Sequence, residues 1–171
     1  MSASFRIFHI SDLHIHNEIL ADPNTFLKGL NGHNIDVWGA FRKHFIGRQK
    51  LSDADSICVV TGDLSSQGSV RGLTFAKQFI LSDPASQISS EMGLQLPKEK
   101  VFIVPGNHDS YNDRLVGKNS LQNYREVFGV NDAFPMTATV AVNGRELSLI
   151  GFDSSYLRAH ISPQKNSGGE L

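Results

Sequence analysis

The sequence predicts an α/β fold, in which helices pack against a sheet that carries the functional side chains. Three short apolar runs each stop abruptly at polar, metal-binding residues, and the stretches between them show helical spacing of apolar residues. Uninterrupted β-branched and aromatic runs of this length indicate strands buried on both faces, as in parallel sheets covered by helices. Parallel strands end at one edge, so we expect the polar residues to meet there.

The first predicted strand is the run Phe5–Ile10, and it is followed at once by Asp12 and His14. A helix is predicted over Ile35–Ile46, because apolar residues recur there at helical spacing after a capping Asn or Asp. This stripe consists of Val37, Trp38, Phe41 and Phe45.

The second predicted strand, Ile57–Thr61, ends at Gly62 and Asp63. Glycine tolerates backbone dihedrals that other residues avoid, so Gly62 lets the chain leave the strand sharply. A second helix is predicted after Ser69, and Ser82-Asp83-Pro84 ends it. Its apolar face consists of Leu73, Ala76, Phe79 and Ile80.

The third predicted strand is Val101–Pro105, which is followed by Gly106-Asn107-His108-Asp109. The segment Pro84–Lys100 before it is predicted to be a long surface loop. A short helix is predicted over Ser120–Phe128, where Gly129 stops it.

Near the end of the chain, the sequence predicts a β-hairpin. The strands are Thr137–Val142 and Glu146–Phe152, and Asn143-Gly144 lies between them. Asn-Gly fits the type I′ turn, whose twist matches that of the flanking strands.

The side chains that follow the three predicted strands suit a metal centre. Asp, Asn and His offer oxygen and nitrogen donors without a thiolate, a set that suits Mn, Fe, Zn, Co or Mg. One Asp can bridge two cations about 3.5–4 Å apart, which can hold a hydroxide between them as nucleophile. Asp63 is the best candidate for that bridge. Taken singly, Asp12 or Asp63 would more often be a turn former or helix cap, but their joint occurrence favours the metal centre.

In their order along the chain, Asp12-x-His14, Gly62-Asp63 and Gly106-Asn107-His108-Asp109 resemble the motifs of the calcineurin-like metallophosphoesterases. The resemblance covers Phe5 to about Ser155. It implies a sandwich of mixed β-sheets flanked by helices, here as a single domain over residues 1–171.

The family pattern continues with a His after a later strand and then a Gly-His-x-His segment, and neither occurs before Leu171. We therefore expect the C-terminal part of the domain to be missing from this chain. Strands from that part would cover apolar surface, so we also expect the chain to expose such surface.

The resemblance also implies a role for each site residue. Asp12, His14 and Asp63 would hold the first of two divalent metal ions, and Asp63 with Asn107 would hold the second. His108 would contact the phosphate and protonate the departing oxygen, a role suited to an imidazole. Asp109 would orient the His108 ring or raise its basicity.

The function implied is metal-dependent hydrolysis of a phosphoric ester, by a phosphodiesterase or phosphatase with a small-molecule or nucleotide-like substrate. Two alternatives stay open. One is a nuclease acting on DNA, and the other is a non-catalytic binding module whose metal site has decayed.

Composition limits the partners. The 171 residues are 40% hydrophobic, which allows a real core, and the net charge of −1 gives no reason to expect attraction to nucleic acid or to an anionic membrane. The single cysteine, Cys58, lies in an apolar run and has no partner for an intramolecular disulfide. With neither a signal-like segment nor an apolar stretch of spanning length, the sequence predicts a cytoplasmic location. The oligomeric state is left open.

Overall fold

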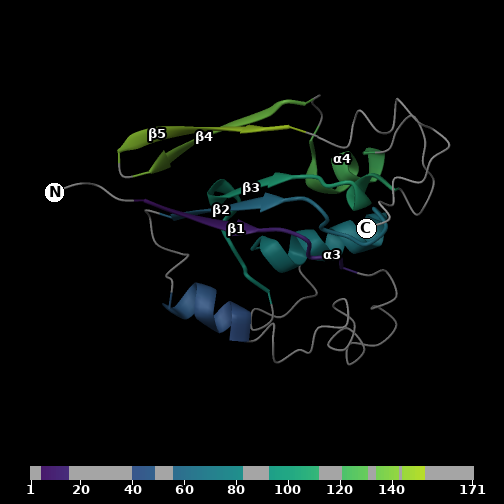
Figure 1. Cartoon of the computed structure of the whole chain (residues 1–171), viewed down its shortest axis with the longest axis horizontal. Coiled ribbons are helices and arrows are strands. Elements are labelled where there is room, and N and C mark those ends of the chain that lie inside the picture. The colour runs from purple at the N-terminus through teal and green to yellow at the C-terminus, as the bar shows by residue number, and fades with distance from the viewer. Residues whose placement is uncertain are drawn as a thin grey trace, which may run out of the picture.

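Three parallel strands form the sheet that the apolar runs predict (Figure 1). They are β1 (Arg6–Ile10), β2 (Ser56–Thr61) and β3 (Val101–Val104), with β2 in the centre. Ile10 lies opposite Val60, and Thr61 lies opposite Val104, so the carboxyl ends of all three strands reach one edge. The structure is a computed structural model that describes residues 5–15, 40–48, 56–82, 93–111, 121–130, 134–142 and 144–152.

Two helices cover one face of this sheet. α3 (Val70–Ile80) begins after Ser69, as the sequence predicts, and the Ser69 hydroxyl accepts a 3.0 Å hydrogen bond from the Gly72 amide. α4 (Gln122–Phe128) ends at Gly129, which has a left-handed conformation. Both helices pack into one core with the inward-facing residues of the strands. The strands contribute Ile10, Cys58, Val60 and Ile103, and the helices contribute Leu73, Phe79 and Tyr124.

The helix predicted over Ile35–Ile46 is confirmed in the part of it that the structure describes. Residues 40–48 are helical, and the last six form the π-helical segment η2 (Lys43–Arg48). Residues 35–39 lie outside the described ranges. The Phe45 ring lies 5.8 Å from the Phe8 ring, which places this segment against β1.

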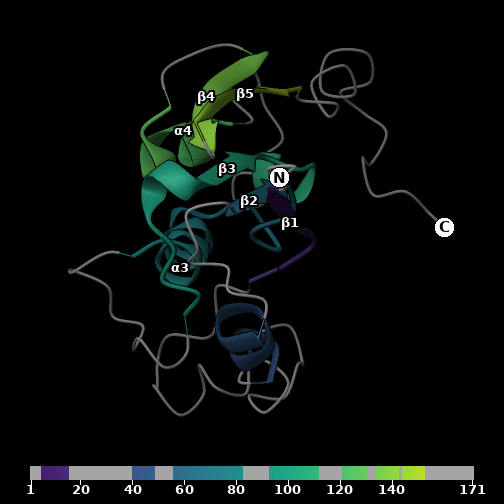
Figure 2. The same cartoon turned by 90° about the vertical axis from the view of Figure 1, so that its left-hand side faces the viewer.

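The predicted hairpin forms a second, antiparallel sheet of β4 (Met136–Val142) and β5 (Arg145–Gly151). It lies on the face of the parallel sheet opposite α3 (Figure 2). Gly151 makes the contact with β3, because a Cβ atom there would come within 3.1 Å of the Phe102 ring and closer still to Val104. The mixed parallel and antiparallel sheets with flanking helices confirm the α/β fold.

The prediction of a surface loop over Pro84–Lys100 is wrong for the second half of this segment. Residues 84–92 lie outside the described ranges, but Leu94 and Leu96 are buried. Their amides donate to the carbonyls of Phe79 and Ile80 at 2.6 and 2.9 Å. This segment therefore provides hydrogen-bond donors for carbonyl groups in the last turn of α3, which lack partners within the helix. A short 3₁₀ turn, η3 (Lys98–Lys100), then leads into β3.

The parallel sheet is also less covered than the apolar runs predict. Ile7 and His9 on β1 are exposed, because the hairpin contacts β3 at the opposite side of the sheet from β1. Ile150 and Phe152 are exposed as well. None of the helices in the described ranges has the length and apolar character needed to cross a membrane.

Candidate metal centre

The segments that follow β1 and β2 run side by side past the ends of their strands. The Asp12 amide donates to the Gly62 carbonyl at 3.2 Å, and the His14 amide donates to the Asp63 carbonyl at 2.8 Å. Ile15 then pairs with Ser65 in a short parallel bridge. The two segments therefore extend the β1–β2 pairing irregularly, and this brings Asp12 and His14 next to Asp63.

These three residues have unusual backbone conformations. Asp12, His14 and Asp63 have φ values of 59°, 44° and 50°, in the left-handed region that residues other than glycine rarely adopt. Gln95 is the other such residue in the described ranges. Conformations of this kind cost roughly 1–3 kcal/mol each and persist where surrounding contacts impose them, often at functional sites. Here the backbone pairing imposes them at three candidate ligands.

The His14 side chain lies close to those of both Asp12 and Asp63. His14 Nε2 lies 3.7 Å from Asp12 Oδ1 and 3.6 Å from Asp63 Oδ2. These separations are too long for hydrogen bonds. Two ligand atoms bound to one cation at about 2.0–2.2 Å can lie up to roughly 4.3 Å apart. The spacing therefore fits His14 with either carboxylate as two ligands of one metal ion, but among the described residues Asp12 does not belong to the group whose ligand atoms all lie within 4.8 Å of one another.

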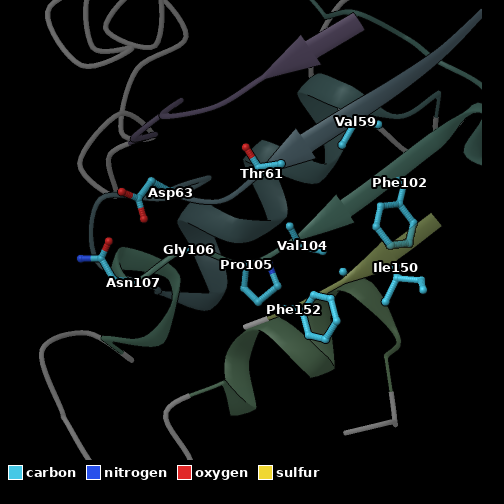
Figure 3. Close-up of a pocket in the computed structure, with 11 residues that line it drawn as sticks. Val59, Thr61, Asp63, Phe102, Val104, Pro105, Gly106, Asn107, Ile150 and Phe152 are labelled. Atoms are coloured by element: carbon cyan, nitrogen blue, oxygen red, sulfur yellow. The ribbon is translucent and has the colours of Figure 1, made fainter. Parts of the chain in front are cut away.

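The segment after β3 approaches Asp63 from its other side. The His108 amide donates to Asp63 Oδ1 at 3.0 Å, while Oδ2 faces His14. Asp63 and Asn107 lie together at the ends of β2 and β3 (Figure 3). Oδ1 of Asp63 is thus bonded to the segment after β3, while Oδ2 faces His14.

Gly106 and Gly62 permit this close approach. A Cβ atom on Gly106 would overlap the amide nitrogen and carboxylate of Asp63, and a Cβ atom on Gly62 would lie 2.6 Å from the Gly106 Cα. Gly62 also has a φ of 83°. Gly62 adopts the left-handed conformation that a glycine permits, as predicted, whereas Gly106 is required because there is no space for a side chain.

His108 is held by the segment that follows Asp63. Its Nδ1 lies 3.0 Å from the Ser66 carbonyl oxygen, which can only accept a hydrogen bond, so Nδ1 carries the proton. The ring meets the His14 ring edge to face, with centroids 4.6 Å apart. This leaves Nε2 as the nitrogen available to a ligand.

The expectation that Asp109 orients the His108 ring is wrong. Asp109 is fully buried, and its carboxylate accepts hydrogen bonds from the amides of Leu64, Ser65 and Gly106 at 3.1, 2.9 and 2.9 Å. Neighbours in η4 (His108–Ser110) project in different directions, which explains the error. Burial raises the pKa of Asp109 to about 6, although the three amide hydrogen bonds oppose the rise. Asp109 joins the segment after β2 to the segment after β3.

Tyr111 is a site residue that the sequence does not reveal. Its hydroxyl accepts a 2.9 Å hydrogen bond from Asn107 Nδ2, and its ring lies 4.7 Å from the His108 ring. With Nδ2 engaged, Asn107 Oδ1 is the amide atom left to bind a cation. The only sequence signal is the four-residue spacing from Asn107 in a helical turn.

The charges of the site also favour a cation. In the described part of the chain, His14 is the only salt-bridge partner of Asp12 and Asp63, so one imidazole lies between two carboxylates. Ligand atoms of His14, Asp63 and His108 all lie within 4.8 Å of one another. The donor set and its spacing therefore fit a divalent metal ion.

Comparison with known proteins agrees with this geometry. No curated protein matches the chain. The model of the calcineurin-like phosphoesterase family matches residues 5–166, a range that contains all three strand-end motifs. This match supports phosphoester hydrolysis as the general type of activity. The chain belongs to the calcineurin-like phosphoesterase family.

Proposed function

We propose that this chain is a metal-dependent phosphoric ester hydrolase with a dinuclear centre at the ends of β1, β2 and β3. The observation that supports this most strongly is the cluster of His14, Asp63 and His108, whose ligand atoms all lie within 4.8 Å of one another, with Asp12 3.7 Å from His14. When bound, two divalent cations would supply electrophilic activation of the phosphoester and a nucleophile derived from water. Mn, Fe and Zn all suit these ligands.

Each site residue has a role in this proposal. Asp12, His14 and Asp63 would hold the first cation, and Asp63 with Asn107 would hold the second. The neutral amide of Asn107 adds no negative charge, which leaves the second cation more electrophilic. His108 has Nδ1–H fixed on the Ser66 carbonyl, so in its imidazolium form the second proton is on Nε2, which would contact the phosphate, give that proton to the departing oxygen and become neutral. Asp109 positions the backbone that carries Asp63 and Asn107.

Hydrolysis of an aryl phosphodiester in the presence of Mn²⁺ tests this proposal. Asp63→Asn should abolish most turnover, since it removes the carboxylate shared by both cations. His108→Ala should lower kcat by roughly 10²–10⁴-fold, the usual contribution of a general acid. Circular dichroism and thermal unfolding of each variant show whether the fold is retained.

Glu99→Gln is the matched control for Asp63→Asn, because Glu99 is an exposed carboxylate in η3 outside the site. It should leave turnover unchanged. Full activity in both Asp63→Asn and His108→Ala would overturn the assignment of the site. Metal binding without turnover of any phosphoester would instead favour a non-catalytic binding module.

A further inference from the structure

The three metal-binding side chains that lie mutually close in the described residues include His108 and omit Asp12. Ligand atoms of His14, Asp63 and His108 all lie within 4.8 Å of one another. Two ligand atoms on one cation can lie up to roughly 4.3 Å apart. Small rotations of the side chains are enough to close the difference. The three residues can therefore hold one cation without Asp12.

The His108 ring has the hydrogen bond that is typical of a metal-bound imidazole. Its Nδ1–H donates to the Ser66 carbonyl at 3.0 Å, which leaves the lone pair of Nε2 available in the neutral ring. Metal-bound histidines almost always donate their other ring N–H to a carbonyl or a carboxylate, which fixes the tautomer and makes the ligand more basic. The Ser66 hydroxyl also donates to the His14 carbonyl at 2.6 Å. Ser66 therefore holds the backbone of one imidazole residue and the ring of the other.

Asp63 is oriented in a similar way, and Asp12 is not. Oδ1 of Asp63 accepts a 3.0 Å hydrogen bond from the His108 amide, and Oδ2 lies 3.6 Å from His14 Nε2. The side chains of His14 and Asp63 are 23% and 15% exposed, whereas that of Asp12 is 66% exposed. An exposed carboxylate loses hydration and rotamer freedom when it binds a cation. His108 is thus the better oriented third ligand.

We infer that the first divalent cation to bind this chain is held by His14, Asp63 and His108, with His108 Nε2 as a ligand. Two imidazoles and one carboxylate form a ligand set that binds Zn²⁺ with a fourth position open to water. This site differs from the proposed dinuclear centre, in which Asp12 is the third ligand of the first cation and His108 binds no metal.

Binding of this cation has a consequence for activity, and that consequence rests on the proposed function. When Nε2 of His108 is bound to a cation, its lone pair cannot carry the proton that the departing oxygen needs. The chain with one bound cation is therefore inactive. Activity requires that His108 leave the metal.

The second cation provides the reason for this exchange. Two divalent cations close together repel each other, and an anionic ligand offsets the repulsion more than a neutral imidazole does. Asp12 Oδ1 lies 3.7 Å from His14 Nε2, so it can reach the first cation. The bond from His108 Nε2 to that cation breaks, a bond from Asp12 forms, and Nε2 takes up a proton from the buffer. His108 is then the general acid of the proposed mechanism.

Calorimetric titration of the metal-free chain with Zn²⁺ tests the ligand set without requiring turnover. His108→Ala should lower the affinity for the first equivalent by about 100-fold or more, because loss of a ligand costs at least as much as loss of a group that orients one. Asp12→Asn should leave this affinity nearly unchanged. His44→Ala is the matched control, because His44 is an exposed histidine in η2, outside the cluster. Loss of affinity in Asp12→Asn and none in His108→Ala would overturn the inference.

Nitrogen NMR of the imidazole rings tests the same ligand in the unsubstituted chain, so the result does not depend on whether a variant folds. With one equivalent of Zn²⁺, the Nε2 resonance of His108 should move to the position of a metal-bound nitrogen, together with a ring nitrogen of His14. A His108 Nε2 resonance that the first equivalent leaves unchanged would overturn the inference.

Turnover of an aryl phosphodiester, followed during the titration, separates the inference from the proposed function. Hydrolysis should begin only after the first equivalent is bound. Binding through His108 with no hydrolysis at any concentration of Zn²⁺ or Mn²⁺ would overturn the hydrolase proposal and leave the three-residue site intact. Hydrolysis that rises in proportion to the first equivalent would overturn the inference alone.

Discussion

The Asn107 side chain has a fixed orientation because its amide nitrogen donates to the Tyr111 hydroxyl. A free carboxamide could present either end to a cation, and only the oxygen is a good ligand for Mn, Fe or Zn. Groups that orient ligands in this way typically contribute 10- to 100-fold to metal affinity or activity. Tyr111 is therefore a positioning residue for the proposed second cation.

Tyr111→Phe should lower affinity at the second site, and with it kcat, by about tenfold. The variant keeps the ring beside His108 and removes only the hydroxyl that holds Asn107. Mn²⁺ titration followed by kinetics at saturating metal measures both effects. Tyr111→Leu removes the ring as well and is the comparison variant: if Tyr111→Phe retains full metal affinity while Tyr111→Leu does not, the ring contact matters and the hydrogen bond does not.

Asp109 shows how far a side chain can lie from the place that its sequence position suggests. Its carboxylate contacts three backbone amides from two segments, and it lies next to His108 only along the chain. Each amide left without an acceptor by its removal would cost about 1–3 kcal/mol. A hydrogen bond to a backbone amide leaves no signal in the sequence, since every residue other than proline offers the same donor.

At the scale of elements, the turn after β3 fits against the turn after β2 only because residue 106 has no side chain. Gly106→Ala would push a methyl group into Asp63, which cannot move without losing its contacts to His14 and the His108 amide. We expect most activity to be lost, together with about 1–3 kcal/mol of unfolding free energy from overpacking.

Activity assays and thermal unfolding measure these losses, and Gly47→Ala is the control. Gly47 is in η2, and a Cβ atom there would have no neighbour within 4 Å. That variant should be neutral or slightly more stable, because alanine restricts the unfolded chain. Equal effects of the two substitutions would show that the lack of space at Gly106 does not matter.

The elements that the sequence predicts correctly are those with a strong local signal. Ser69 begins α3, Gly129 ends α4, and Gly144 adopts a φ of 70° in the hairpin turn. The sequence does not predict the burial of Leu94 and Leu96. Their burial depends on contacts with the end of α3, and a local sequence pattern does not report contacts between separate segments. The exposure of β1 was missed for a similar reason, since a run of apolar residues does not reveal which neighbours cover it.

At the scale of the whole molecule, the site depends on sheet topology. Asp12, Asp63 and Asn107 come from segments that are far apart in the chain, and parallel pairing in the order β1-β2-β3 brings them to one edge. This convergence could be predicted, because parallel strands end on one side. The left-handed conformations and the contact to Tyr111 could not, because they depend on how the segments pair beyond the strands.

Binding of Mn²⁺ by the purified chain, followed by elemental analysis and thermal unfolding, tests most directly whether the three strand ends form one metal centre. A ligand present at about 100 times its Kd adds roughly 2.7 kcal/mol to the free energy of unfolding. We therefore predict that Mn²⁺ raises the Tm of the chain, and that Asp63→Asn loses both the bound metal and the increase. A chain that retains no Mn²⁺, or an Asp63→Asn variant that Mn²⁺ stabilises equally, would contradict this account.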